Sequence, residues 1–176
     1  MKLNRFLTVV ALAVLSISLT SCNKEQAPIV LTGSWKIDTA GTALGIVFNQ
    51  VYAEENPVAL QFLKDNKEKV RKLLFNPERV VFDATSAVTF NYTNSAPVAG
   101  TYTKSDFYFT ITNSVFPNGI NGASDNIYLE LYYSKAFMMD LLFSILTEND
   151  PPESAFISLI DKFEAIGLYK KMVTPL

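Results

Sequence analysis

Apolar and polar residues alternate along the middle of the chain with a period of two. The segments with this pattern are Arg79–Asp83, Ala87–Thr93, Val98–Lys104, Phe107–Asn113 and Ile127–Tyr133. Such alternation is typical of antiparallel strands with one face on a core and one face in water. Ser105-Asp106 fits a tight hairpin turn, and Gly100 indicates a bulge or bend. The pattern therefore predicts an antiparallel meander, with a loop over Asn113–Asp125.

Segments outside the meander complete the predicted order of elements. Ile29–Asp38 is expected to be the first strand and Leu168–Thr174 the last. Helices are predicted over Ala43–Phe75 (broken near its middle), Lys135–Thr147 and Pro152–Ala165. Asn56 and Pro57 have the residue types that favour a helix start, and Gly167 is a typical helix end. We expect a sheet with one helical insertion after its first strand and a helix pair before its last strand.

The start of the chain has the pattern of a secretory signal. Lys2 and Arg5 precede the apolar run Phe6–Leu19, which small residues close before a single cysteine. The run is short for a membrane-spanning helix. Leu19-Thr20-Ser21-Cys22 resembles the lipobox of bacterial lipoproteins, which implies that Cys22 is acylated and becomes the first mature residue.

This resemblance predicts how the chain is divided and where in the cell the protein is located. Residues 1–21 are expected to be a cleaved signal peptide, residues 22–28 a lipidated tether, and residues 29–176 a single domain. Acyl chains on Cys22 would hold the protein on a membrane without a spanning helix. The expected location is the outer membrane of the cell envelope, on its periplasmic or surface side.

Composition argues against several classes of function. Removal of Lys2 and Arg5 with the signal changes the formal charge from −2 to −4, and no basic block remains to bind nucleic acid. The chain has no histidine, the commonest general base and transition-metal ligand. Its carboxylate clusters, such as Glu54-Glu55, fall at predicted helix ends or on solvated faces. We therefore predict no catalytic residues, no metal, no cofactor and no enzymatic activity.

Gly33-Ser34-Trp35 on the first strand, followed by an aromatic meander and a returning last strand, resembles the lipocalin or calycin superfamily. With the lipobox and the strand Gly100-Thr101-Tyr102-Thr103, the layout is more similar to the calycin-like lipoproteins of Bacteroidetes, a group of unknown function. The resemblance implies a mainly β fold, with an antiparallel calycin-like barrel that Gly33 and Trp35 close at one end.

The residues that alternate inward suggest a binding site for a small hydrophobic ligand such as a lipid, a sterol or an aromatic compound. They are Phe90, Tyr92, Tyr102, Phe107, Phe109 and Tyr133. Ligand sites are mostly apolar with a few polar groups, which tyrosine hydroxyls supply. Ordinary core packing is the other interpretation, because a barrel of this size can be filled by its own side chains.

The segment Phe137–Leu146 is apolar on most of its helical surface, so it is either buried or in contact with a membrane or a protein partner. Two functions therefore remain open for this membrane-anchored lipoprotein. The first is ligand binding in or at the mouth of the barrel. The alternative is a non-catalytic structural or protein-interaction role in an envelope complex. An empty aromatic cavity would favour the first, and a filled barrel with an exposed apolar helix would favour the second.

Overall fold

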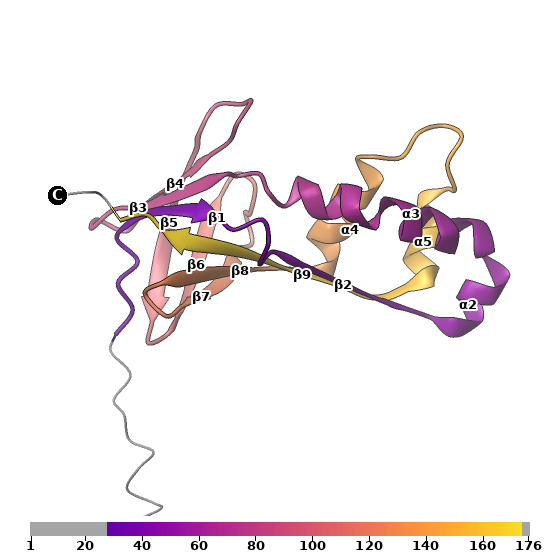
Figure 1. Cartoon of the computed structure of the whole chain (residues 1–176), viewed down its shortest axis with the longest axis horizontal. Coiled ribbons are helices and arrows are strands. Elements are labelled where there is room, and N and C mark those ends of the chain that lie inside the picture. The colour runs from indigo at the N-terminus through magenta and orange to yellow at the C-terminus, as the bar shows by residue number, and fades with distance from the viewer. Residues whose placement is uncertain (1–27, 174–176) are drawn as a thin grey trace, which may run out of the picture.

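The computed structural model describes residues 28–173, and most of them belong to one antiparallel sheet with a few helices (Figure 1). The strands are β1 (Gly33–Ile37), β2 (Ala43–Phe48), β3 (Arg79–Phe82), β4 (Ala87–Asn91), β5 (Val98–Ser105), β6 (Tyr108–Asn113), β7 (Ile120–Ser124), β8 (Tyr128–Tyr133) and β9 (Ile160–Lys171). The helices are α2 (Gln50–Glu55), α3 (Pro57–Leu73), α4 (Lys135–Phe143) and α5 (Glu153–Leu159).

The sheet closes on itself as an eight-stranded antiparallel barrel. Neighbouring strands follow the order β1-β3-β4-β5-β6-β7-β8-β9, and pairing of β1 with β9 closes the ring. Trp35 faces Lys171 and Ile37 faces Tyr169 across this closing ladder. The predicted fold class is confirmed, since the chain is mainly β and consistent with a calycin-like barrel with helices after the first strand and before the last.

The long strand β9 joins the barrel to the helices. Its second half pairs with β8 and β1 inside the ring, whereas its first half runs outward and pairs with β2. The prediction of a helix from Ala43 was wrong here, because residues 43–48 form β2 and the helical segment begins only at Gln50. A short apolar run fits strand and helix equally, and pairing with β9 decides in favour of the strand.

Two more expectations about secondary structure were wrong. The predicted loop Asn113–Asp125 contains β7, whose small residues let it pack closely between β6 and β8. The predicted helix Pro152–Ala165 ends at Leu159, where the chain enters β9. Gly167 therefore lies within a strand, and the ring of Tyr133 occupies the space above it.

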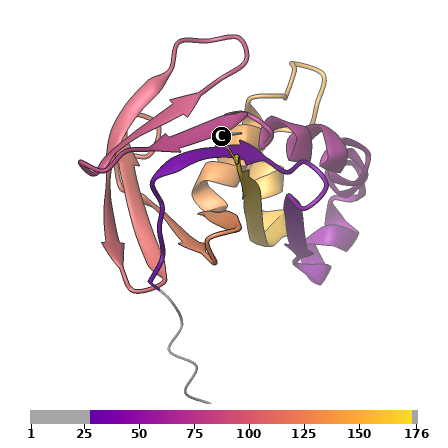
Figure 2. The ribbon, with the colours of Figure 1, turned by 60° about the vertical axis from the view of Figure 1, so that its left-hand side comes forward.

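The helices gather at one end of the barrel, around the protruding part of β2 and β9 (Figures 1 and 2). Helix α4 packs against β9 and α3, with Met138, Met139 and Leu142 buried. No large apolar side chain of α4 is among the exposed ones in residues 28–173. Within that range, no helix is both long and apolar enough to cross a membrane.

Candidate functional site

The six aromatic residues predicted to form a ligand site lie in different places in the barrel. Phe90, Phe109 and Tyr133 are buried, and Tyr92, Tyr102 and Phe107 are partly buried. Tyr102 and Phe109 pack edge-on against Phe82, with ring centroids 5.0 and 5.6 Å apart. The Tyr102 hydroxyl donates a hydrogen bond to the carbonyl oxygen of Asp83 at 2.8 Å. These two residues are thus engaged in packing inside or along the barrel wall.

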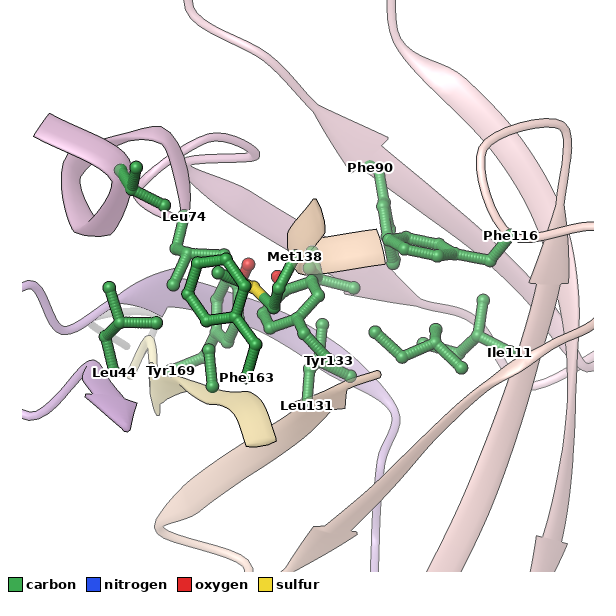
Figure 3. Packing of buried hydrophobic residues seen from close by; sticks show 14 of the residues in the cluster. Leu44, Leu74, Phe90, Ile111, Phe116, Leu131, Tyr133, Met138, Phe163 and Tyr169 are labelled. Carbon is green, nitrogen blue, oxygen red and sulfur yellow. The ribbon is translucent and has the colours of Figure 1, made fainter. Parts of the chain in front are cut away.

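Side chains fill the interior of the barrel. Phe90 meets Phe116 at 5.9 Å between centroids, and Phe116 in turn contacts Tyr133 and Phe137. The rings of Tyr133 and Phe137 are stacked at 5.1 Å. Figure 3 shows this continuous packing from Ile111 and Phe116 through Tyr133 to the helical end. The predicted aromatic set does not surround a common empty cup.

A pocket of about 450 Å³ lies where the helices meet the mouth of the filled barrel. Its walls come from the end of α3, the Asn76-Pro77 turn, the ends of β4 and β8, and α4. They comprise Leu73, Leu74, Asn76, Pro77, Tyr92, Ser95, Val98, Val115, Phe116, Tyr133, Phe137, Leu141 and Ser144. This size and this apolar lining with a few polar groups are typical of small-molecule sites. We refer to it as the mouth pocket.

Three tyrosines lie in or directly behind the wall of the mouth pocket. Tyr92 and Tyr133 belong to its lining, and Tyr169 lies behind Tyr133 on β9. Figure 3 shows the phenol oxygens of Tyr133 and Tyr169 next to each other beside the sulfur of Met138. Burial, with a smaller contribution from Tyr92, raises the pKa of Tyr133 to about 12, although the phenol of Tyr169 acts to lower it. Burial and the phenols of Tyr133 and Tyr92 raise the pKa of Tyr169 well above its ordinary value, and burial raises that of Tyr92. All three are therefore neutral hydrogen-bond donors at physiological pH.

The neighbouring hydroxyls of Tyr133 and Tyr169 differ in how well they are hydrogen-bonded. Tyr169 donates to the carbonyl oxygen of Pro77 at 3.2 Å, whereas the Tyr133 oxygen is buried and makes no bond of acceptable geometry to residues 28–173. The Tyr133 side chain is only 4 % exposed. A buried hydroxyl without a partner costs about 1–3 kcal/mol, and a ligand that offers an acceptor removes that cost.

The mouth pocket also restricts the charge of what it can hold. None of its lining residues is acidic or basic. A buried ionised group without a counter-charge is strongly disfavoured. The pocket therefore fits an uncharged, largely apolar molecule with one hydrogen-bond acceptor, such as a carbonyl, ester or sterol hydroxyl oxygen.

The two residues of the predicted barrel-closing motif lie at the other end of the barrel. Trp35 on β1 is fully buried, and its indole nitrogen donates to the carbonyl oxygen of Leu31 at 2.7 Å. Gly33 has a φ of +125°, a conformation that side-chain-bearing residues rarely adopt. The buried side chains of Ile29 and Leu31 lie in the segment just before this motif. Cys22, the predicted lipidation site, lies outside the described residues.

Other features of the structure carry less functional signal. A larger pocket of about 550 Å³ lies along β2, β8 and β9, but its walls mix Lys135, Lys162, Asp161 and Glu164 with apolar residues. Among residues 28–173, no three His, Cys, Asp or Glu side chains gather as a metal site needs.

Sequence reasoning missed several residues of the mouth pocket. Phe116 falls within the predicted loop, and Leu74, Phe137 and Leu141 belong to helical segments. Tyr169 alternates with Leu168 and Lys170 in the predicted last strand, Leu168–Thr174, so its inward direction could have been found from the period of two. The unpartnered state of Tyr133 depends on the folded neighbourhood and has no sequence signal.

Comparison of this chain with models of protein families, with curated proteins and with solved structures gives no match.

Proposed function

We propose that this protein is a membrane-anchored lipoprotein of the cell envelope that binds a small, uncharged hydrophobic ligand at the mouth of its barrel. The unpartnered hydroxyl of Tyr133 beside an uncharged pocket of about 450 Å³ is the observation that carries the proposal. Folding places a donor there at a cost in stability, and such costs concentrate at functional sites. The resemblance to calycin-like lipoproteins of Bacteroidetes is in line with membrane anchoring in the cell envelope.

The arrangement of α4 supports ligand binding over a purely structural role in an envelope complex. An accessory protein was expected to combine a filled barrel with an exposed apolar helix. The barrel is filled, but α4 packs on α3 and β9 and contributes Phe137 and Leu141 to the mouth pocket. The helix thus acts as a wall of the pocket rather than as a free surface.

The ligand-binding proposal is tested by titrating the full chain with a fatty acid, the methyl ester of that acid and a neutral sterol. Tyrosine and tryptophan fluorescence and the melting temperature report binding. We expect a saturable signal and a raised melting temperature with the ester or the sterol, and weaker binding of the ionised acid. Absence of a saturable signal with every probe would contradict the proposal.

The variant Tyr133→Phe makes this test specific to the pocket. Loss of the unpartnered hydroxyl should raise the free energy of unfolding by about 1 kcal/mol and should lower the affinity for the ester or the sterol several-fold. Tyr169→Phe is the matched control. It removes a hydroxyl that is bonded to Pro77, so it should lower stability by about 1 kcal/mol. A Tyr133→Phe protein that is less stable but binds normally would show that the hydroxyl has only a structural role.

Membrane attachment through Cys22 is tested separately. In its own host, the Cys22→Ala protein should leave the membrane fraction, and radiolabelled palmitate should be incorporated into the wild-type chain but not into the Cys22→Ala chain, because acyl chains on one residue supply the anchor. Ser21→Ala, which keeps a small residue before the cysteine, is the control. Attachment of the Cys22→Ala protein as firm as that of the wild type would refute lipidation as the anchor.

A further inference from the structure

A third pocket, on the outer face of β6, β7 and β8, combines aromatic rings with negative charge. It has a volume of about 310 Å³. Half of its lining residues are aromatic, namely Phe107, Tyr108, Tyr128 and Tyr132. The remaining lining includes the carboxylates of Glu130 and Asp125 and no basic side chain.

The strand register explains why a hollow forms here. Tyr108 on β6 faces Ala123 on β7, and Ala123 faces Glu130 on β8. The small Ala123 thus lies between two larger outward-facing residues and leaves space between them. Tyr128 and Tyr132 flank Glu130 on the same face of β8, because residues two apart on a strand point to the same side.

The tyrosine rings around this hollow do not pack against other aromatic rings. The Tyr132 hydroxyl donates to Oε2 of Glu130 at 2.6 Å, which fixes that ring against the carboxylate. Unlike the rings of the core, Tyr108, Tyr128 and Tyr132 form no stacked or edge-on pair with any aromatic ring of residues 28–173. Tyr108 is 62 % exposed. The exposed rings of Tyr108 and Tyr132 are therefore available to a ligand.

A pocket that combines aromatic ring faces with a carboxylate and has no basic side chain is complementary to an organic cation. A cation over an aromatic ring gains from the negative face of the ring, and quaternary ammonium groups add apolar methyl contacts. A carboxylate nearby adds direct attraction. Lys170 faces Tyr128 across the β8–β9 ladder, but it is not part of the pocket lining.

We propose that the pocket formed by Tyr108, Tyr128, Tyr132 and Glu130 binds a small organic cation of the quaternary ammonium class. This site is separate from the mouth pocket and takes a ligand of opposite character, so it does not depend on the proposed hydrophobic ligand. A neutral molecule of the same shape gains no attraction from the carboxylates and little from the ring faces.

The probe pair is choline and 3,3-dimethyl-1-butanol, its neutral analogue of the same shape. The full chain in a non-ionic polyoxyethylene detergent is titrated with each at constant ionic strength, and saturation-transfer NMR reads the methyl signals. We expect saturable transfer to choline only. Tyr108→Leu and Glu130→Gln should each lower the affinity for choline by about 3- to 10-fold. Tyr52→Leu, at an exposed tyrosine on α2, is the matched control and should bind as the wild type does.

Tyr108 is well exposed and Glu130→Gln keeps the shape of the side chain, so both variants should retain the wild-type melting temperature. Equal transfer to both probes, no saturable transfer to choline, or unchanged binding by both pocket variants would overturn the proposal. Weaker ligand binding at the mouth pocket, as expected for Tyr133→Phe, would leave choline binding unchanged. The two proposals can therefore be refuted independently of each other.

Discussion

Replacement of Trp35 by alanine is expected to lower the free energy of unfolding by about 3–5 kcal/mol. The indole is fully buried, and its nitrogen donates to the carbonyl oxygen of Leu31. The ammonium of Lys171 lies 5.1 Å above the ring centroid. The substitution would remove the packing, leave a cavity and deprive the Leu31 carbonyl of its donor.

The position of Trp35 makes this loss more than local. Trp35 pairs with Val80 on β3 and with Lys171 on β9, so it lies at the seam where β1 closes the barrel. Thermal or denaturant unfolding of the full chain measures the change, and Tyr52→Ala, at an exposed aromatic residue, controls for loss of a ring. A Trp35→Ala protein that melts with the wild type would show that the barrel closes without this side chain.

Local patterns predicted the meander because one face of each of its strands is more buried than the other. In β6, Phe109 and Ile111 are buried and alternate with Tyr108, Thr110 and Thr112. A tight hairpin formed here, but one residue later than the expected Ser105-Asp106: Ser105 pairs with Tyr108, and the turn residues are Asp106, with a φ of +48°, and Phe107. Gly100 was expected at a bulge or bend, but the register runs through it without a shift. Side-chain alternation is a short-range signal, so one sequence is enough to read it.

Elements that depend on distant partners were not predictable in the same way. The apolar run of β2 becomes a strand only because β9 lies beside it, more than a hundred residues later in the chain. Ile160 and Phe163 were assigned to a helix, yet both are buried in β9. For β7, the residues that had looked like a loop are small because β6 and β8 leave little room.

In the candidate site, too, some features follow from the local sequence pattern and others depend on contacts between distant segments. Tyr92 and Tyr133 were expected to face inward, and both line the mouth pocket. The pocket itself arises where the end of α3, the Asn76-Pro77 turn and α4 meet the barrel, and no local pattern encodes that meeting. The missing partner of the Tyr133 hydroxyl is also a property of the whole fold.

Replacement of Gly100 by alanine is expected to lower the free energy of unfolding by about 3 kcal/mol, because the new methyl group would overlap the backbone of the neighbouring strand. An added Cβ would lie 2.4 Å from the carbonyl oxygen of Thr112 and 2.7 Å from the Cβ of Asn113. Neither atom can move freely, since β5 and β6 are paired from Gly100 to Ser105. The glycine is thus required by close strand packing and not by an unusual backbone angle.

Gly45→Ala on β2 provides the matched control for this prediction. Its added Cβ would meet only the carbonyl oxygen of Glu164, at 3.8 Å, which is ordinary van der Waals contact. Alanine there restricts the unfolded chain without a clash, so stability should stay equal or rise by about 0.4–1 kcal/mol. Denaturant unfolding of both variants measures the difference. If Gly100→Ala were as stable as Gly45→Ala, β5 and β6 would have to move apart at Gly100 at little cost in free energy. The close contact of these strands would then not explain the glycine.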